Sequence, residues 1–495
     1  MINALCFAVL VGLTGAQHQV KPPNIVFILC DDLGYGDIGA FGQTKIKTPH
    51  IDRLAREGMK FTRHYSGNNV CAPSRCVLLS GMHPGHAYIR DNRGGLGPDR
   101  EGQEPVPAGS LKLPLELKAL GYTLGGFGKW GLGPVASSGD PLNQGFDRFY
   151  GFNCQAVAHN YYPTYLWDNT QKALLNNKKF AANQKLPEGA DRNDPEVYLA
   201  FSGKDYAPDL ICSQALKFID DNKDRPFFLY FPTTVPHLAL QVPEDSLREY
   251  EGAFPETPYP GGKGYLPHRT PRAAYAAMVT RLDREVGKLI DKVDQKGLTG
   301  NTIFVFTSDN GPLYDKLGGT DADFFNSAGG LRGRKGSFYE GGFRVPLIVR
   351  WKGTIREGTT SSRITGFEDW LPTLLELVGH REVTPKGIDG LSFALTLLGS
   401  AQNERPFLYR ESPGYGGSQC ILMGKWKAIR NKLNPGAKVK LAQALPLELY
   451  DLSNDPGETT DIAKGHPEVV ARMEAIMRSE HLPSKLFPIR ILDQE

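Results

Sequence analysis

Four short runs of β-prone apolar residues constrain the fold of this chain most, because each run is apolar at almost every position. A strand with alternating apolar and polar residues is buried on one face, whereas a continuously apolar strand is buried on both. Helical patterns separate the runs: Thr48 is placed to cap a helix beginning at Pro49, and a longer pattern covers residues 275–293. This alternation predicts an α/β fold with a large, mixed but mainly parallel sheet sandwiched by helices. The four runs are residues 24–30, 226–231, 302–307 and 345–349.

The pattern changes near residue 385, where turn-rich sequence leads to short strand-like stretches and then to an amphipathic helix over residues 466–479. We therefore expect a larger α/β domain over residues 22–385 and a smaller subdomain, an antiparallel sheet plus a helix, over residues 386–495. Residues 168–205 are polar and rich in Asn and Lys, which predicts a long surface insertion. The strand-like stretches are residues 406–411, 420–430 and 447–451.

Charge and targeting signals narrow the range of partners. A formal net charge of +3 over 495 residues is too small to indicate nucleic acid or an anionic membrane as a partner. Residues 1–16 are mostly apolar and end in Thr14-Gly15-Ala16, which predicts a cleaved signal peptide and a periplasmic or secreted protein. No other stretch is long and apolar enough for a membrane span. The cysteines beyond this leader are irregularly spaced, which indicates neither a disulfide framework nor a zinc site.

Acidic turns follow two of the predicted strands directly. Asp31 and Asp32 come after residues 24–30, and Asp309 and Asn310 come after residues 302–307. Ligands of open α/β sheets collect beyond the carboxyl ends of the strands, so these turns are expected to meet. Two carboxylates about 4 Å apart repel by roughly 4 kcal/mol at an effective dielectric near 20, which a bound cation would offset. Oxygen ligands select Ca²⁺ or Mg²⁺, and their number favours Ca²⁺.

A third feature is the eleven-residue segment over residues 71–81, Cys-Ala-Pro-Ser-Arg-Cys-Val-Leu-Leu-Ser-Gly. Pro73 suits the first turn of a helix because its missing N–H has no partner there in any case. Cys71 is then expected just outside a helix N-terminus, where unpaired N–H groups favour an anion such as a sulfate or phosphate group.

This segment resembles the signature of the formylglycine-dependent (type I) sulfatases, and in particular of arylsulfatase-like bacterial carbohydrate sulfatases. The resemblance implies an alkaline-phosphatase-like fold and hydrolysis of a sulfate ester. It also implies that a formylglycine-generating or sulfatase-maturating enzyme oxidises Cys71 to an aldehyde, formylglycine, whose hydrate is the nucleophile. The implied ligands of one Ca²⁺ are Asp31, Asp32, Cys71, Asp309 and Asn310.

Further family motifs recur in order along the chain, at residues 128–133, 234–237, 333–336 and 339–342, with secondary landmarks at 369–373 and 449–452. By resemblance, Arg75 polarises the nucleophile, Lys129 and Lys335 hold sulfate oxygens, and His237 or Lys335 protonates the leaving alcohol.

One position departs from the family. Gly131 stands where the family usually has a His, the residue thought to accept a proton when the enzyme is regenerated. His159 is our candidate replacement, because a neutral imidazole near its ordinary pKa can accept a proton at neutral pH.

Two segments point to a sugar substrate. Residues 86–92 and 158–163 look like segments of bacterial carbohydrate sulfatases, which makes Arg90, Asn92 and His159 candidate sugar contacts. A phosphonate or phosphodiester hydrolase of the same superfamily is an alternative, as is a catalytically silent glycan-binding relative. The sugar, the sulfated position and exo or endo action stay open.

Overall fold

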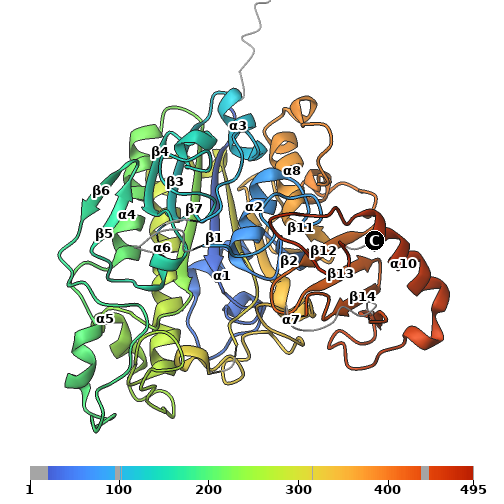
Figure 1. The fold of residues 1–495 in the computed structure, drawn as a ribbon. Helices are drawn as coiled ribbons and strands as arrows, with labels where there is room; N and C mark the ends of the chain where they lie inside the picture. Colours follow the sequence, from blue (N-terminus) through green and yellow to red (C-terminus); the bar gives the residue numbers. More distant parts are fainter. Residues whose placement is uncertain (1–20, 95–100, 102, 315, 436–444, 494–495) are drawn as a thin grey trace, which may run out of the picture.

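A computed structural model describes residues 21–94, 101, 103–314, 316–435 and 445–493 of the chain. The leader predicted over residues 1–16 lies outside the described residues. Figure 1 shows a large twisted sheet with helices on both sides and a smaller unit beside one edge. The predicted α/β fold is confirmed, and no helix of the described part is long and apolar enough to cross a membrane.

Strand β1 lies near the centre of the large sheet and pairs in parallel with β7 and β8. The strand order is β10-β2-β9-β8-β1-β7-β3-β4-β5-β6, with β11 also paired to β2. β9 runs antiparallel to β2 and β8, and β5 and β6 add an antiparallel edge. The strands are β1 (Asn24–Asp31), β2 (Met59–Tyr65), β3 (Thr123–Lys129), β4 (Arg148–Phe152), β5 (Tyr165–Asp168), β6 (Gln171–Leu174), β7 (Phe227–Pro236), β8 (Thr302–Ser308), β9 (Arg344–Arg350), β10 (Thr359–Ser361) and β11 (Thr365–Gly366).

Alternate residues of β1 enter two separate cores, as a strand covered on both faces requires. Val26 and Ile28 pack with α1, α4 and α6, whereas Phe27 and Leu29 pack with α2, α3 and α8. The helices are α1 (Pro49–Arg56), α2 (Cys71–Ser80), α3 (Lys112–Ala119), α4 (Ala207–Asn222), α5 (Glu244–Leu247), α6 (Pro271–Gln295), α7 (Glu340–Phe343), α8 (Trp370–Leu377) and α9 (Ala394–Leu397).

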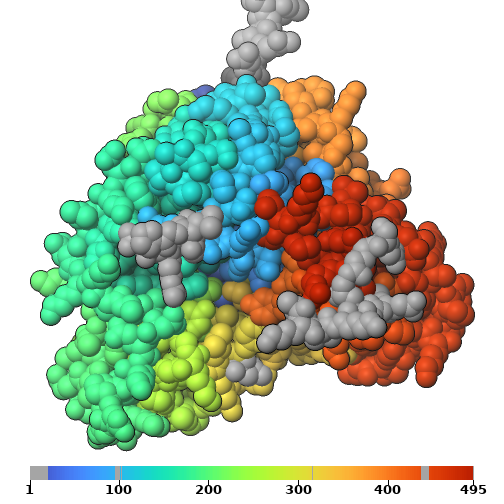
Figure 2. Space-filling view, viewed as in Figure 1, coloured from blue at the N-terminus to red at the C-terminus, as the bar shows by residue number. Residues whose placement is uncertain are grey.

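The C-terminal unit is an antiparallel sheet of four strands among the described residues, in the order β12-β13-β14-β15, with α10 on one face. The single strand predicted over residues 420–430 is wrong: it is a hairpin, because Gly424 adopts a left-handed φ of 61° between β13 and β14. Figure 2 shows this unit, in orange and red, packed against the rest of the molecule. The domain boundary near residue 385 stays a prediction. The elements are β12 (Leu408–Ser412), β13 (Ser418–Met423), β14 (Trp426–Asn431), β15 (Glu448–Asp451) and α10 (Pro467–Ser479).

A buried ion pair joins the two units. The guanidinium of Arg410 on β12 lies 2.7 Å from a carboxylate oxygen of Glu368, and both side chains are buried. Burial of a charge is costly unless a partner of opposite charge compensates it, and this pair meets that need for both residues.

Candidate active site

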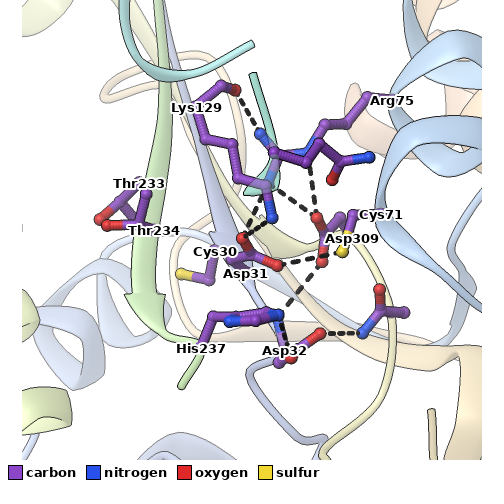
Figure 3. Close-up of polar contacts among 12 residues, drawn as sticks. Cys30, Asp31, Asp32, Cys71, Arg75, Lys129, Thr233, Thr234, His237 and Asp309 are labelled. Atoms are coloured by element: carbon purple, nitrogen blue, oxygen red, sulfur yellow. Dashed lines mark hydrogen bonds and ion pairs between the residues drawn. The ribbon is translucent and has the colours of Figure 1, made fainter. Parts of the chain in front are cut away.

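The candidate site lies at the carboxyl ends of four adjacent parallel strands, in the order β8-β1-β7-β3. Asp31 ends β1, Lys129 ends β3, His237 follows β7 and Asp309 follows β8. Cys71 reaches the same place from the start of α2 (Figure 3). Parallel pairing sends these strand ends to one edge of the sheet, which is how residues more than two hundred positions apart come together.

Cys71 is the first residue of α2 and not the residue just outside it, since Val70 is the N-cap. Its Sγ lies 3.4 Å from Asp31 Oδ1 and 3.3 Å from Lys335 Nζ. Burial, followed by the charge of Asp31, raises the pKa of the Cys71 thiol to about 12. An unmodified thiol is therefore protonated at neutral pH and is a weak nucleophile.

Three buried carboxylates face three buried cations around Cys71. Lys129 Nζ lies 2.6 Å from Asp31 Oδ2, and Lys335 Nζ lies 2.6 Å from Asp32 Oδ1. The third pair joins Arg75 Nη2 to Asp309 Oδ2 at 2.7 Å, and Arg75 Nε donates to the same oxygen at 3.0 Å. The dashed lines of Figure 3 include the contacts of Lys129 and Arg75.

The cations do not stabilise the charged forms of all three carboxylates equally. Burial favours the neutral form of Asp31, yet the charges of Lys129 and other nearby cations hold its pKa below the ordinary value. Burial prevails at Asp309, where it and the charge of Asp31 raise the pKa to about 7 despite Arg75. The pKa of Asp32 is also raised, mainly by burial. The protein's own cations thus keep Asp31 in its charged form, whereas burial still favours the neutral forms of Asp32 and Asp309.

Several buried polar atoms lack a partner, which fits a bound metal ion. Asp32 Oδ2 and Asn310 Oδ1 have no hydrogen-bond partner. Asp32 Oδ2 lies 3.4 Å from Nε2 of His237, whose Nδ1 donates to the carbonyl of Leu238 at 2.6 Å. Burial and Lys335 hold the pKa of His237 well below its usual value, so Nε2 of the neutral ring is an acceptor facing another acceptor. A hard divalent cation suits this oxygen-rich donor set. Ligand atoms of four residues lie within 4.8 Å of one another: Asp31, Asp32, Cys71 and His237.

A cavity of about 510 Å³ opens above these groups. Sequence reasoning anticipated Cys71, Asn92, Lys129, His159, His237 and Lys335 among its lining residues. It missed three aromatic residues and two amides, which come from loops without a recognisable motif. Of these, only Gln155 could have been predicted as a site residue, because it lies shortly after the carboxyl end of β4. The aromatic and amide residues missed are Gln103, Gln155, Tyr265, Tyr314 and Tyr415, and Arg93 is a further lining residue that was not predicted.

His159 stacks on His237, with ring centroids 4.6 Å apart and planes within 9°. Burial, together with the neighbouring His237, Lys129 and Lys335, holds the pKa of His159 well below its usual value. The expectation of an ordinary pKa is therefore wrong. The ring is neutral, so it can accept a proton, but it is a weaker base than a solvated imidazole.

The space beside Gly131 is occupied by Gln155. Gly131 has a left-handed φ of 90°, and a Cβ added there would lie 3.1 Å from Gln155 Cγ. Gln155 Nε2 donates to Asn92 Oδ1 at 3.0 Å, and the same oxygen accepts from the backbone N–H of Ala72 at 3.0 Å. Asn92 thus ties the cavity wall to the first turn of the Cys71 helix.

Arg90 is not a cavity residue, which corrects its assignment as a sugar contact. Its Nε donates to the carbonyl of Ala87 at 3.0 Å, and its Nη1 donates to Glu411 Oε1 at 3.0 Å. Nη1 also donates to the carbonyl of Leu482. Arg90 therefore connects the loop after α2 to the C-terminal unit.

Comparison with known proteins gives the family. A sequence model described as Sulfatase matches residues 23–380, and a second, described as N-sulphoglucosamine sulphohydrolase, C-terminal, matches residues 334–481. The chain belongs to the sulfatase family. It is a sulfuric ester hydrolase, as the sequence resemblance implied.

Relatives of this sulfatase cover nearly its whole length. It is 30% identical to N-acetylgalactosamine-6-O-sulfatase of Bacteroides thetaiotaomicron, over 94% of this chain and 96% of that protein. It is 31% identical to human arylsulfatase A, over 95% and 90% of the two chains. The solved structure of Ps i-CgsB is 27% identical with a TM-score of 0.73, over 93% of this sulfatase and 92% of that chain. Ps i-CgsB has also been solved in complex with k-i-k-neocarrahexaose.

Proposed function

We propose that this sulfatase removes sulfate from a carbohydrate, using Cys71 converted to formylglycine and one bound Ca²⁺. The observation that carries the proposal is the arrangement at the base of the cavity. Cys71 lies there between Asp31 and Lys335, next to buried oxygens of Asp32 and Asn310 that have no partner. A modified Cys71 side chain would face the same cations as the present thiol.

The metal would be held by five residues, with Asp32 Oδ2 and Asn310 Oδ1 the oxygens that most need a cation. A bound Ca²⁺ would neutralise carboxylate charge and polarise a sulfate oxygen. Three carboxylates and three cations of the protein cancel, so a divalent ion leaves the site with a charge of +2 toward a monoanionic sulfate ester. The five proposed ligands are Asp31, Asp32, Asp309, Asn310 and the modified Cys71.

Each cation has a defined task in this proposal, and Lys335 has two. Lys129 and Lys335 hold sulfate oxygens, while Arg75 fixes the carboxylate of Asp309. Negative charge moves to the leaving oxygen as the S–O bond breaks, and a fixed donor aimed at developing charge is worth about 3–4 kcal/mol. Lys335 is assigned the proton donated to the leaving alcohol, since it carries one in this geometry whereas His237 is neutral.

Enzyme regeneration needs a proton acceptor that Gly131 cannot supply. His159 is the proposed acceptor, because it is neutral, lines the cavity and stacks on His237. The Gln155 side chain that fills the space beside Gly131 is an amide and has no basic nitrogen.

A carbohydrate fits the rest of the cavity. Tyr265, Tyr314 and Tyr415 offer aromatic surface, and Gln103 and Gln155 offer amides that bond to hydroxyl groups. Relatives named for sulfated sugars support the same substrate class. The leader over residues 1–16 supports a periplasmic or secreted location, and the proposed Cys71 conversion requires a maturation enzyme as a partner.

The test is expression with and without a formylglycine-generating enzyme, followed by peptide mass spectrometry of the Cys71 segment. We expect the aldehyde and turnover of an aryl sulfate to appear together. Cys71→Ala should abolish turnover, whereas the matched control Cys76→Ala, later in the same buried helix, should retain it. Fully active protein with an unmodified Cys71 thiol would refute the mechanism.

Two further substrates separate the alternatives. Faster turnover of an aryl phosphonate than of an aryl sulfate would indicate the phosphonate hydrolase. Binding of sulfated sugars without any turnover by the aldehyde-bearing protein would indicate the silent glycan-binding relative. Defined sulfated monosaccharides would then identify the sugar and the sulfated position.

A further inference from the structure

A second hollow, which we call the side groove, adjoins the active-site cavity. Its volume is about 830 Å³, and it is lined by the short helix η3 (Ala156–His159), by β5 and β6 and by the segment around residues 179–183. Ala156 and His159 line both spaces. The active-site cavity and the side groove therefore adjoin at Ala156 and His159.

Two aromatic rings form one wall of the side groove. Tyr165 and Trp167 lie two positions apart on β5, so their side chains share a face of the strand. Their rings meet edge to face, with centroids 5.9 Å apart and planes at 84°. Glu101 accepts hydrogen bonds from Tyr165 Oη and, at 3.2 Å, from Trp167 Nε1, which fixes both rings. Neither ring is fully buried. A fixed and partly exposed aromatic pair is a surface on which a sugar ring packs with little loss of side-chain freedom.

Cations lie on the same wall. Lys172 Nζ on β6 is 4.1 Å from the centroid of Tyr165 and 5.3 Å from that of Trp167, so the aromatic pair positions an ammonium group. Lys179 also lines the groove, and both lysines are exposed. Glu101 is the one carboxylate among the described lining residues, and it is engaged with the two rings. The side groove thus offers aromatic surface next to two positive charges.

We propose that the side groove binds the sugar units that follow the sulfated one, with an anionic group of the chain on Lys172 and Lys179. This inference rests on the proposed function and narrows its substrate class to oligosaccharides that carry a second sulfate or a carboxylate. A polar, uncharged glycan would use the aromatic wall but not the lysines. A single sulfated sugar would fill only the active-site cavity.

The insertion over residues 168–205 acquires a role in this proposal. It contains β6, whose Lys172 pairs across the strands with Trp167, and it supplies the segment with Lys179. The insertion therefore builds the outer wall of a substrate channel at the antiparallel edge of the large sheet.

The experiment compares kcat/KM for an aryl sulfate with kcat/KM for tetrasaccharides of chondroitin sulfate and of carrageenan. Chondroitin fragments supply carboxylates and sulfates, whereas carrageenan fragments supply sulfates alone, so the pair separates the two sources of negative charge. In Lys172→Ala and in Trp167→Ala we expect the ratio of tetrasaccharide to aryl sulfate kcat/KM to fall at least tenfold. Added salt should weaken the effect of Lys172→Ala but not that of Trp167→Ala.

The matched control is Lys178→Ala, an exposed lysine of the same insertion that is not among the lining residues, and it should leave the ratio unchanged. An unchanged ratio in both groove variants would overturn the proposal, and wild-type turnover of aryl sulfate would then still support the proposed function. If wild-type protein turns over no sulfate ester, calorimetry of tetrasaccharide binding tests the side groove independently of catalysis. Tetrasaccharide binding to the Cys71→Ala protein that persists after Trp167→Ala is added would overturn the proposal. Loss of that binding in the double variant would support the proposal.

Discussion

Replacement of Arg75 by Met tests whether the buried cations hold the proposed metal ligands in their charged form. At 2.7 Å the attraction between Arg75 and Asp309 is about 6 kcal/mol at an effective dielectric near 20. Desolvation offsets much of this, and removal of one partner of a buried pair costs about 3–5 kcal/mol. The pKa of Asp309 is already about 7, so loss of Arg75 would leave this carboxyl protonated at neutral pH. We therefore expect lower stability, lower calcium affinity and almost no turnover.

Arg410→Met is the matched control, because Arg410 is equally buried and pairs with Glu368 at the same distance, 2.7 Å, away from the site. Both variants should lose a similar amount of free energy of unfolding, measured by urea denaturation with a chelator present. Only Arg75→Met should lose calcium in a binding isotherm and lose turnover of an aryl sulfate. The reasoning is refuted if Arg75→Met binds calcium as tightly as the wild type, or if Arg410→Met loses calcium to the same degree.

Three other predictions concern the metal, the proton acceptor and the pair formed by His86 and Asp389. Chelation should lower the thermal midpoint, because an ion that binds only the folded state stabilises that state. At a free ion concentration of one hundred times Kd this stabilisation is about 2.7 kcal/mol. An unchanged midpoint would argue against a bound metal. His159→Ala should give a burst of the alcohol product followed by slow turnover, whereas a raised KM with unchanged kcat would make His159 a sugar contact. A hydrogen bond to Asp389 raises the pKa of His86 above 6.5, so its contribution to stability is present below pH 6.5 and is lost as the pH rises through the raised value. The urea midpoint should therefore decrease when the pH is raised from 6 to 8. This decrease should be smaller in Asp389→Asn.

The central strands and the convergence of the site could be predicted from the sequence, for one physical reason. A strand buried on both faces must be apolar throughout, so β1, β7 and β8 stand out without any knowledge of their neighbours. Parallel pairing then places the residues after each strand at one edge. The positions of Asp31 and Asp309 follow from these two facts alone.

Residues whose role depends on distant partners could not be predicted in this way. Arg90 follows the Cys71 helix in a segment that looks like one of bacterial carbohydrate sulfatases, which suggests a sugar contact. Its partner Glu411 lies 321 positions away on β12, and nothing in the local sequence indicates that pairing. The hairpin within residues 420–430 was missed because both strands are β-prone, so that only the left-handed Gly424 marks the turn.

Gly131 shows how sequence and structure complement each other at the site. The sequence reveals that a side chain is missing from a family motif, which by itself suggests an empty space and an impaired enzyme. The structure shows that the space is filled by Gln155, which is hydrogen bonded to Asn92 and through it to the start of the Cys71 helix. A His placed at position 131 would need a left-handed backbone and would press on Gln155. The glycine is therefore part of a differently built cavity wall, and the proposed proton acceptor is His159 on another element, where its ring is stacked on His237.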